Sequence, residues 1–244
     1  MQRPLPTLHQ KVPPSDPPSR SKRLAASLVA LFGADIAVNG VKGIPQHALA
    51  RSMEAAADSA SLTAGEVAKM EGYLGLAGKD IVYSEPFRDL GSRFSPWANS
   101  VVARKARPDI FAHELGHAAN FLGKSRVLKG VQGVGAVGKL VAGTLPLLAA
   151  AASADDDSRT GRAAKYLPAV AAVAMAPVLA EEAIATARGY AALNSVRGTT
   201  AARKMLRVNA KGLASYGLAA GAAVASPLAI RKVKKLLLKS RPND

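Results

Sequence analysis

The stretch Phe111-Ala112-His113-Glu114-Leu115-Gly116-His117-Ala118 places two histidines four positions apart. On a helix, this spacing brings His113 and His117 to one face, one turn apart, so that both imidazoles can reach one Zn²⁺ at about 2.0–2.1 Å. Glu114 follows the first histidine, where a carboxylate can accept a proton from a metal-bound water and pass it to a leaving amine. The stretch therefore predicts a zinc-binding helix with Glu114 as its general base.

The residues around this motif give the predicted helix clear ends. Pro108 suits the first turn of a helix, and Gly123 is placed to end it after Leu122. Inside the helix, Gly116 lets another backbone or a substrate approach closely. We therefore expect one helix that holds both histidines.

Short strands are expected upstream of this helix, at residues 80–84 and 100–104, with a loop between them. The second strand is a candidate for binding an extended peptide at its edge. Before the strands, Thr63 and Glu66 form a capping box that predicts the start of a helix, which Gly78 would end. Together with the apolar segments described below, this predicts a mainly α protein with a small β element (α+β).

The composition limits both the fold and the choice of metal ligands. Hydrophobic residues make up 49% of the chain but aromatic residues only 5%, which favours closely packed helices with small side chains. There is no cysteine, so histidine and carboxylate side chains must hold any metal ion. The other two histidines, His9 in a Pro-rich leader and His47 in a loop, are expected to be exposed rather than to bind the metal.

Long uncharged segments follow the motif, at residues 140–154, 166–180 and 213–230. A 15-residue helix spans about 23 Å, short of the ~30 Å hydrocarbon core, although flanking residues and lysine side chains can extend it. We expect 130–181 to form a membrane-inserted helical hairpin, with a soluble Ala-rich bundle as the alternative. An earlier apolar segment, 24–38, is expected to be a buried or membrane-surface helix rather than a processed signal.

A catalytic zinc site needs a third protein ligand and an open fourth position. The metzincin extension of the motif is absent, because Asn120 and Gly123 stand where glycine and histidine would be needed. The downstream candidates are the aspartates at 155–157, in a polar break, and Glu181 and Glu182 at the end of an apolar segment. An ionised carboxylate in that setting needs a cation, which a zinc ion would supply.

The stretch 111–118 resembles the active-site helix of the membrane gluzincins, which include HtpX-like and CAAX-prenyl-type endopeptidases and YugP-like neutral zinc peptidases. Their third ligand begins a Glu-x-x-Ala-(Asp/Ser) element, and the residues from Glu182 to Thr186 are similar in that register. The resemblance implies Glu182 as the third zinc ligand. It also implies that Thr186 replaces the residue that orients a ligand histidine, since a hydroxyl can accept that hydrogen bond more weakly.

The same families place a hydrophobic helical hairpin between the histidine motif and this glutamate, as 130–181 does here. The resemblance covers about residues 95–193, and Glu181 stays open as the competing ligand. Near the glutamates, Arg188 and Tyr190 are candidates to stabilise an oxyanion, because a cation or a phenol near the metal can do so. The alternative for both residues is an ordinary surface or core role.

The formal net charge of +16 indicates an anionic partner. Beyond Ile184, the only acidic residue is Asp244, but no aromatic residues interleave with the basic ones to stack on bases. Anionic membrane lipid is therefore favoured over nucleic acid, and a solvated basic face is the further alternative. The positive-inside rule places 231–239 on the cytoplasmic side. The zinc site is also expected on the cytoplasmic side. Both expectations hold only if one of the three apolar segments does not cross the membrane, or if 24–38 also crosses it.

The sequence thus predicts a membrane-associated zinc endopeptidase that acts on a peptide or protein substrate. The alternative is a non-enzymatic membrane or particle structural protein that retains the peptidase-like zinc helix. The oligomeric state is not predicted. The expected organisation has five parts. They are a disordered basic leader (1–22), the peptidase-like part with the motif (23–129), a hydrophobic hairpin (130–181), a third-ligand helix with a basic connection (182–212) and an apolar helix with a basic tail (213–244).

Overall fold

The computed structural model of the chain describes residues 19–32, 60–86 and 92–239. Within these residues the protein is mainly helical with one small sheet, as predicted. Besides a helix over residues 20–32, the elements in chain order are α2 (Ala64–Leu74), β1 (Val82–Ser84), β2 (Arg93–Ser95), β3 (Ser100–Val102), α3 (Pro108–Leu122), α4 (Arg126–Ala151), α5 (Arg159–Ala164) and α6 (Leu167–Lys239).

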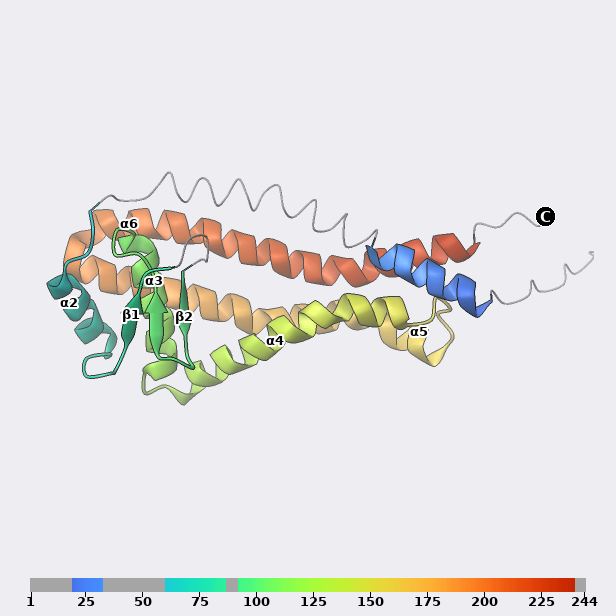
Figure 1. Cartoon of the computed structure of the whole chain (residues 1–244), viewed down its shortest axis with the longest axis horizontal. Coiled ribbons are helices and arrows are strands. Elements are labelled where there is room, and N and C mark those ends of the chain that lie inside the picture. Colours follow the sequence, from blue (N-terminus) through green and yellow to red (C-terminus); the bar gives the residue numbers. More distant parts are fainter. Residues whose placement is uncertain (1–18, 33–59, 87–91, 240–244) are drawn as a thin grey trace, which may run out of the picture.

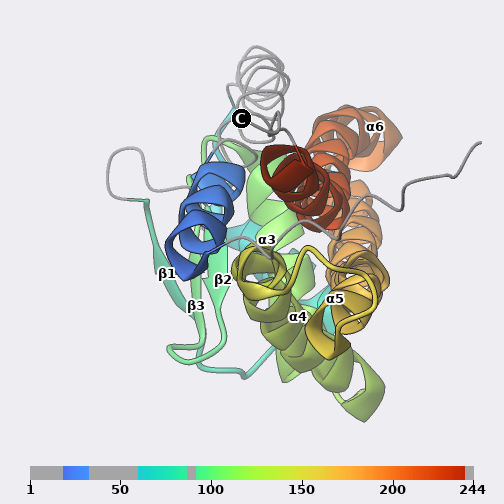
Figure 2. The same ribbon diagram turned by 90° about the vertical axis from the view of Figure 1, so that its right-hand side faces the viewer.

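The molecule is elongated, with a head at one end and a helical stalk (Figure 1). Helix α6 bends at Gly198, whose φ of 76° lies in the left-handed region that favours glycine. The bend divides α6 into a first arm, residues 167–197, and a second arm, residues 199–239, which lie alongside each other (Figures 1 and 2). The head consists of α2, the sheet, α3 and the bend of α6, and the stalk of α4, α5 and the rest of the two arms.

Helix α2 begins as predicted and ends earlier than predicted. The Thr63 hydroxyl accepts a hydrogen bond from the Glu66 amide at 3.2 Å, and the Thr63 amide donates to the Glu66 carboxylate at 2.8 Å. The helix ends at Leu74 and not at Gly78, because Gly75 already adopts the left-handed conformation (φ 70°) that terminates a helix. The capping box is therefore confirmed, and the predicted end is wrong.

The sheet has the strand order β1-β3-β2, with β1 parallel and β2 antiparallel to β3. Strand β2 falls in the segment that was predicted to be a loop, because its three residues lie next to Pro96 and give no periodic signal. Since β3 is paired on both sides, its edge is not available to a peptide, and the prediction that this strand binds one is wrong. The edge strand on that side of the sheet is β2.

Helix α3 lies between the sheet and the first arm of α6. Its predicted bounds are confirmed, with Pro108 in the first turn and Gly123 at the C-terminal cap. Phe111 is fully buried and stacks on Tyr83, with ring centroids 5.5 Å apart. The core of the head joins α2, β3, α3 and both sides of the α6 bend through the buried side chains of Leu62, Val67, Met70, Leu76, Val101, Ala103, Phe111, Ala112, Leu115, Ala118, Ala119, Ala192, Leu193 and Met205.

Two glycines allow α3 and α6 to meet backbone to backbone. A Cβ atom on Gly116 would lie 2.1 Å from the carbonyl oxygen of Ala185, and one on Gly189 would lie 2.5 Å from that of Ala112. Neither position has room for a side chain. The expected close approach at Gly116 is thus confirmed, and the approaching group is the first arm of α6.

An ion pair closes the head beside the bend of α6. The Arg197 guanidinium donates to the two carboxylate oxygens of Glu66 at 2.7 and 3.0 Å, and to the carbonyl oxygens of Ala60 and Ser61 at 2.9 and 2.8 Å. Arg197 immediately precedes the bend at Gly198. The contact therefore fixes the start of α2 against the point at which α6 reverses direction.

In the stalk, α4 packs closely along α6, and a Cβ atom on Gly138 would lie 2.0 Å from the carbonyl oxygen of Ala174. By length and composition, Arg126–Ala151 and the helical region Arg159–Leu238 are apolar enough to cross a membrane. Only 33% and 28% of their most apolar windows are buried inside the protein. Large apolar side chains therefore face outward along the stalk, including those of Leu140, Leu147, Leu148, Val173, Leu218 and Leu228.

The predicted polar break joins the helices at the far end of the stalk. The Asp156 carboxylate pairs with Arg231 and Lys235, each at 2.5 Å, and with Lys165 at 3.8 Å. Nearby, the buried Lys234 ammonium donates to the carbonyl oxygens of Ala150 and Ala152 at the end of α4, at 2.7 and 2.6 Å. Lysine is thus used here to satisfy the last carbonyls of a helix.

The helix over residues 20–32 lies at the same end (Figures 1 and 2). Its Ala30 packs in a small buried cluster with Ala149, Ala150 and Ile230. The helix begins inside the segment that was expected to be a disordered leader, whose residues 1–18 lie outside the described part of the chain, as do 33–38 of the predicted apolar segment.

We predict that Gly116→Ala lowers the free energy of unfolding by about 1–3 kcal/mol, because the added methyl group forces α3 away from Ala185. Chemical denaturation followed by circular dichroism in one detergent measures the change. Gly130→Ala is the matched control, since a Cβ atom there meets no described atom within 4 Å and alanine favours a helix by roughly 0.5–1 kcal/mol. Equal stability of the two variants would contradict the packing described.

The contact between Glu66 and Arg197 predicts a dependence of stability on pH. Hydrogen bonds from Arg197 lower the pKa of Glu66 from its ordinary value of 4.5 to about 2. The folded carboxylate thus binds a proton less readily than the unfolded one. Its contribution is complete above pH 4.5 and is lost as the pH falls toward 2.

We therefore expect the melting temperature of Glu66→Gln to fall less than that of the wild type between about pH 5 and pH 3. The exposed Glu85→Gln serves as the control and should follow the wild type. Parallel curves for Glu66→Gln and the wild type would show that this ion pair does not contribute.

Candidate metal centre

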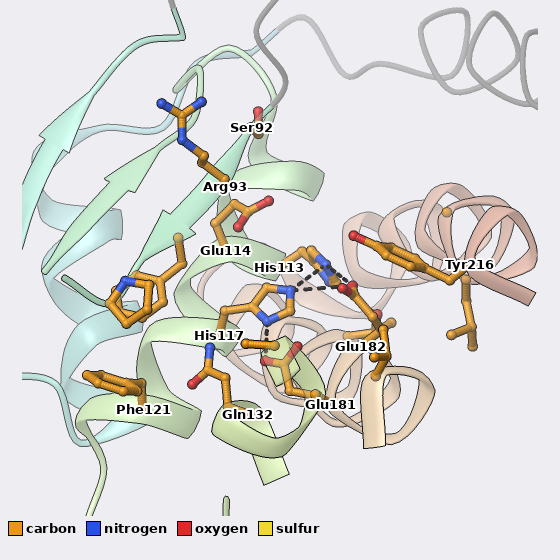
Figure 3. A pocket seen from close by; sticks show the side chains of 18 of the residues that line it. Ser92, Arg93, His113, Glu114, His117, Phe121, Gln132, Glu181, Glu182 and Tyr216 are labelled. Atoms are coloured by element: carbon orange, nitrogen blue, oxygen red, sulfur yellow. Dashed lines mark hydrogen bonds and ion pairs between the residues drawn. The ribbon is translucent and has the colours of Figure 1, made fainter. Parts of the chain in front are cut away.

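Two elements far apart in the sequence bring three side chains to one point (Figure 3). Helix α3 presents His113 and His117 on one face, and the first arm of α6 presents Glu182 opposite them. The Nε2 atoms of the two histidines lie 3.0 Å apart, and Glu182 Oε2 lies 3.3 Å from His113 Nε2 and 3.5 Å from His117 Nε2. These three residues form a group that can hold a metal ion.

The spacing of the three atoms suits a tetrahedral ion. Ligands at about 2.0–2.1 Å in tetrahedral geometry are separated from one another by about 3.3 Å. The observed separations of 3.0, 3.3 and 3.5 Å bracket that value. Two imidazoles and one carboxylate are also a ligand set that zinc accepts, with one position left open for water or substrate.

A second pair of contacts fixes the orientation of both histidines. The Nδ1 atom of His113 lies 3.1 Å from the Thr186 hydroxyl, and that of His117 is hydrogen-bonded to Glu181. With each Nδ1 engaged in this way, each Nε2 is directed toward Glu182. Of the two competing glutamates, Glu182 therefore belongs to the metal-ligand group, and Glu181 positions a histidine.

The charge state of His117 follows from its neighbours. Burial alone would lower its pKa, but the hydrogen bonds to Glu181 and Glu182 outweigh burial and raise the pKa to about 10. In the metal-free protein the imidazole therefore holds a proton at neutral pH. A metal ion that binds Nε2 has to displace this proton, so metal affinity should fall as the pH falls.

Glu114 lies in the same cavity as the metal-ligand group and is only 6% exposed. Burial raises the pKa of its carboxyl group, while the nearby imidazoles and a hydrogen bond with the Phe94 backbone oppose that change. A raised pKa suits a group that must accept a proton and then release it. Because Phe94 belongs to β2, the edge strand also helps to hold the predicted general base.

A cavity of about 700 Å³ opens over the site. The edge strand β2 and α3 form one wall, and α4 and the second arm of α6 form the other. The second wall brings in residues that the sequence analysis did not identify, namely Gln132, Lys139, Asn209 and Tyr216. Lys139 Nζ lies 3.9 Å from Glu182 Oε1 and 5.2 Å from the centre of the Tyr216 ring.

The structure places Arg188 and Tyr190 away from the cavity. Tyr190 packs against the core of the head, eight residues or about 12 Å along the helix from Glu182. Arg188 lies near Gly123 at the end of α3. The structure therefore does not bring these two residues to the metal-ligand group, and the phenol that lines the cavity is Tyr216. His9 and His47 lie outside the described residues.

Comparison of the chain with models of known families, with curated proteins and with solved structures gives no match. The geometry and chemistry of the site therefore carry the functional conclusion. The resemblance to membrane gluzincins stays a prediction from the motif and from the Glu182 element.

We predict that Glu182→Gln abolishes stoichiometric Zn²⁺ binding at neutral pH, because it removes a charged ligand. Glu181→Gln should retain binding with an affinity reduced about 10–100-fold, since it loses only the group that orients His117. Isothermal titration calorimetry measures both affinities. The reverse order, with Glu181→Gln the more damaging change, would make Glu181 the ligand.

Proposed function

We propose that this protein is a membrane-associated zinc endopeptidase. The observation that carries the proposal is the convergence of His113, His117 and Glu182 at ligand spacing, with Glu114 in the same cavity. The membrane gluzincins combine the same three features, which are the histidine motif, a third carboxylate and a hydrophobic hairpin between them. A purely structural protein would have no need for a buried general base beside an open cavity.

In the proposed reaction, Glu114 accepts a proton from the attacking water and later donates it to the amine of the departing peptide. His113, His117 and Glu182 would hold a zinc ion, which would supply Lewis acidity for the peptide carbonyl and the attacking water. Thr186 and Glu181 keep the two imidazoles in place. The phenol of Tyr216 lines the same cavity, where it can donate a hydrogen bond to the developing oxyanion.

The stalk is the proposed membrane-embedded part. Residues 213–230 of the second arm have no charged residue and span about 27 Å, close to the ~30 Å hydrocarbon core. Basic residues follow at once, beginning with Arg231, and suit the headgroups of anionic lipids. Because the second arm leads from the head to the far end (Figure 1), a stalk that crosses the bilayer separates the metal site from 231–239. The metal site and 231–239 therefore cannot both lie on the cytoplasmic side of the membrane.

We expect Glu114→Gln to keep near-stoichiometric zinc and to lose hydrolysis by about 10²–10⁴-fold, because it removes the proton acceptor and not a metal ligand. Mass spectrometry of bound metal and cleavage of fluorescent casein, both in detergent or lipid nanodiscs, give the two readouts. The exposed Asp80→Asn is the control and should cleave as the wild type does. A wild-type protein that binds no zinc at neutral pH, or that binds zinc without cleaving, would favour the structural alternative.

A further inference from the structure

The second wall of the cavity repeats one pattern on two helices. On α4, Gln132 and Lys139 are separated by seven residues, with Gly133, Gly135 and Ala136 between them lining the cavity. Seven residues are about two helical turns, so Gln132, Ala136 and Lys139 share a face. Each end of the pattern is polar, and the middle is small enough to leave room for a ligand.

The second arm of α6 shows the same arrangement. Asn209 and Tyr216 are also seven residues apart and also enclose cavity-lining positions, among them Gly212 and Leu213. Both helices run from the head toward the far end of the stalk (Figure 1), and they meet where Lys139 lies over the Tyr216 ring. Gln132 and Asn209 are thus the head-side ends of the two patterns, and Lys139 and Tyr216 are the opposite ends.

The head-side ends of the two patterns carry two polar atoms that have no partner among the described residues. Asn209 is only 6% exposed, and its Nδ2 atom has no hydrogen-bond partner among the described residues. Within the same part of the chain, Gln132 Oε1 is also buried and unpaired. Leaving a buried amide unsatisfied destabilises a protein, so such a group in a cavity wall indicates that a ligand completes it.

The two atoms are complementary to the hydrogen-bonding groups of a peptide bond. Asn209 Nδ2 can donate to a carbonyl oxygen, and Gln132 Oε1 can accept from an amide N–H. Along its own helix, each of the two amide side chains lies seven residues, about 10 Å, from Lys139 or Tyr216. At Gly133, next to Gln132 on α4, a Cβ atom would meet no described atom within 4 Å.

We propose that Gln132 and Asn209 form a subsite for the backbone of an extended peptide in the cavity over the metal-ligand group. The subsite recognises the main chain and not a particular side chain. This inference rests on the proposed peptidase function, but it concerns binding alone and is therefore tested with a protein that does not cleave.

The test uses full-length Glu114→Gln loaded with Zn²⁺ in nanodiscs. The probes are random decapeptides with an acetylated N-terminus and an amidated C-terminus. The reporter is the fluorescence of Trp97, the single tryptophan of the chain, which lines the cavity and is 98% exposed. The tightest peptide is then resynthesised with one N-methylated amide at each position in turn, which removes one N–H donor at a time.

We expect N-methylation at one position to weaken binding about tenfold, the worth of one hydrogen bond. In Gln132→Met, the unmodified peptide should bind about tenfold more weakly, and the penalty at that position should vanish. Asn209→Leu should also weaken binding about tenfold while leaving zinc content unchanged and the melting temperature equal or higher. If Asn209→Leu does not fold, Asn209→Asp removes the same donor with little change in volume.

Asn120→Leu is the matched control. The Asn120 side chain is buried and also lacks a partner among the described residues, but it does not line the cavity. It should bind the peptide as the parent does. The subsite would be overturned if no peptide binds, or if N-methylation has no position-specific effect. It would also be overturned if Asn209→Leu binds the peptide with unchanged affinity or has a lowered melting temperature. Zinc content and cleavage by the wild type decide the proposed function separately.

Discussion

The backbone contact between Gly116 and Ala185 is the constraint on which the metal centre depends. It brings α3 and the first arm of α6 closer than any side chain at position 116 would allow. At that separation, Glu182 reaches both Nε2 atoms, and Thr186 and Glu181 reach the two Nδ1 atoms. The glycine in the histidine motif is thus as much a part of the site as the ligands are, because it sets the distance at which they meet.

The stalk gives the site its second half. Helix α4 leaves the head and the first arm of α6 returns to it, which delivers Glu182 to the histidines. After the bend at Gly198, the second arm passes the same site again and closes the cavity with Tyr216. One helix therefore supplies both the third ligand and the opposite wall. This arrangement explains how a head with a small sheet and two short helices can carry a site that has walls on both sides.

The sequence predicted the features that depend on neighbouring residues or on the repeat of the helix. The bounds of α3 follow from Pro108 and Gly123, and the facing histidines follow from a spacing of four. The features that it missed are set by tertiary packing. Strand β2 is too short to show a period, and the contribution of Tyr216 depends on the reversal at Gly198. Tyr190 is near Glu182 in the sequence, but the rise of the helix carries it away from the site.

The two sides of the metal-ligand group are separated by a long stretch of chain, since Glu182 follows His117 by 65 residues. A metal ion bound there would act as a removable clasp between them. An ion that binds the folded protein and not the unfolded chain stabilises the fold by about 4 kcal/mol when the free ion is at a thousand times its Kd. In a protein without cysteine, a bound metal ion would link the two segments in the folded state, where another protein could use a disulfide. The head of the molecule would then loosen when metal is scarce, while the stalk keeps its own packing.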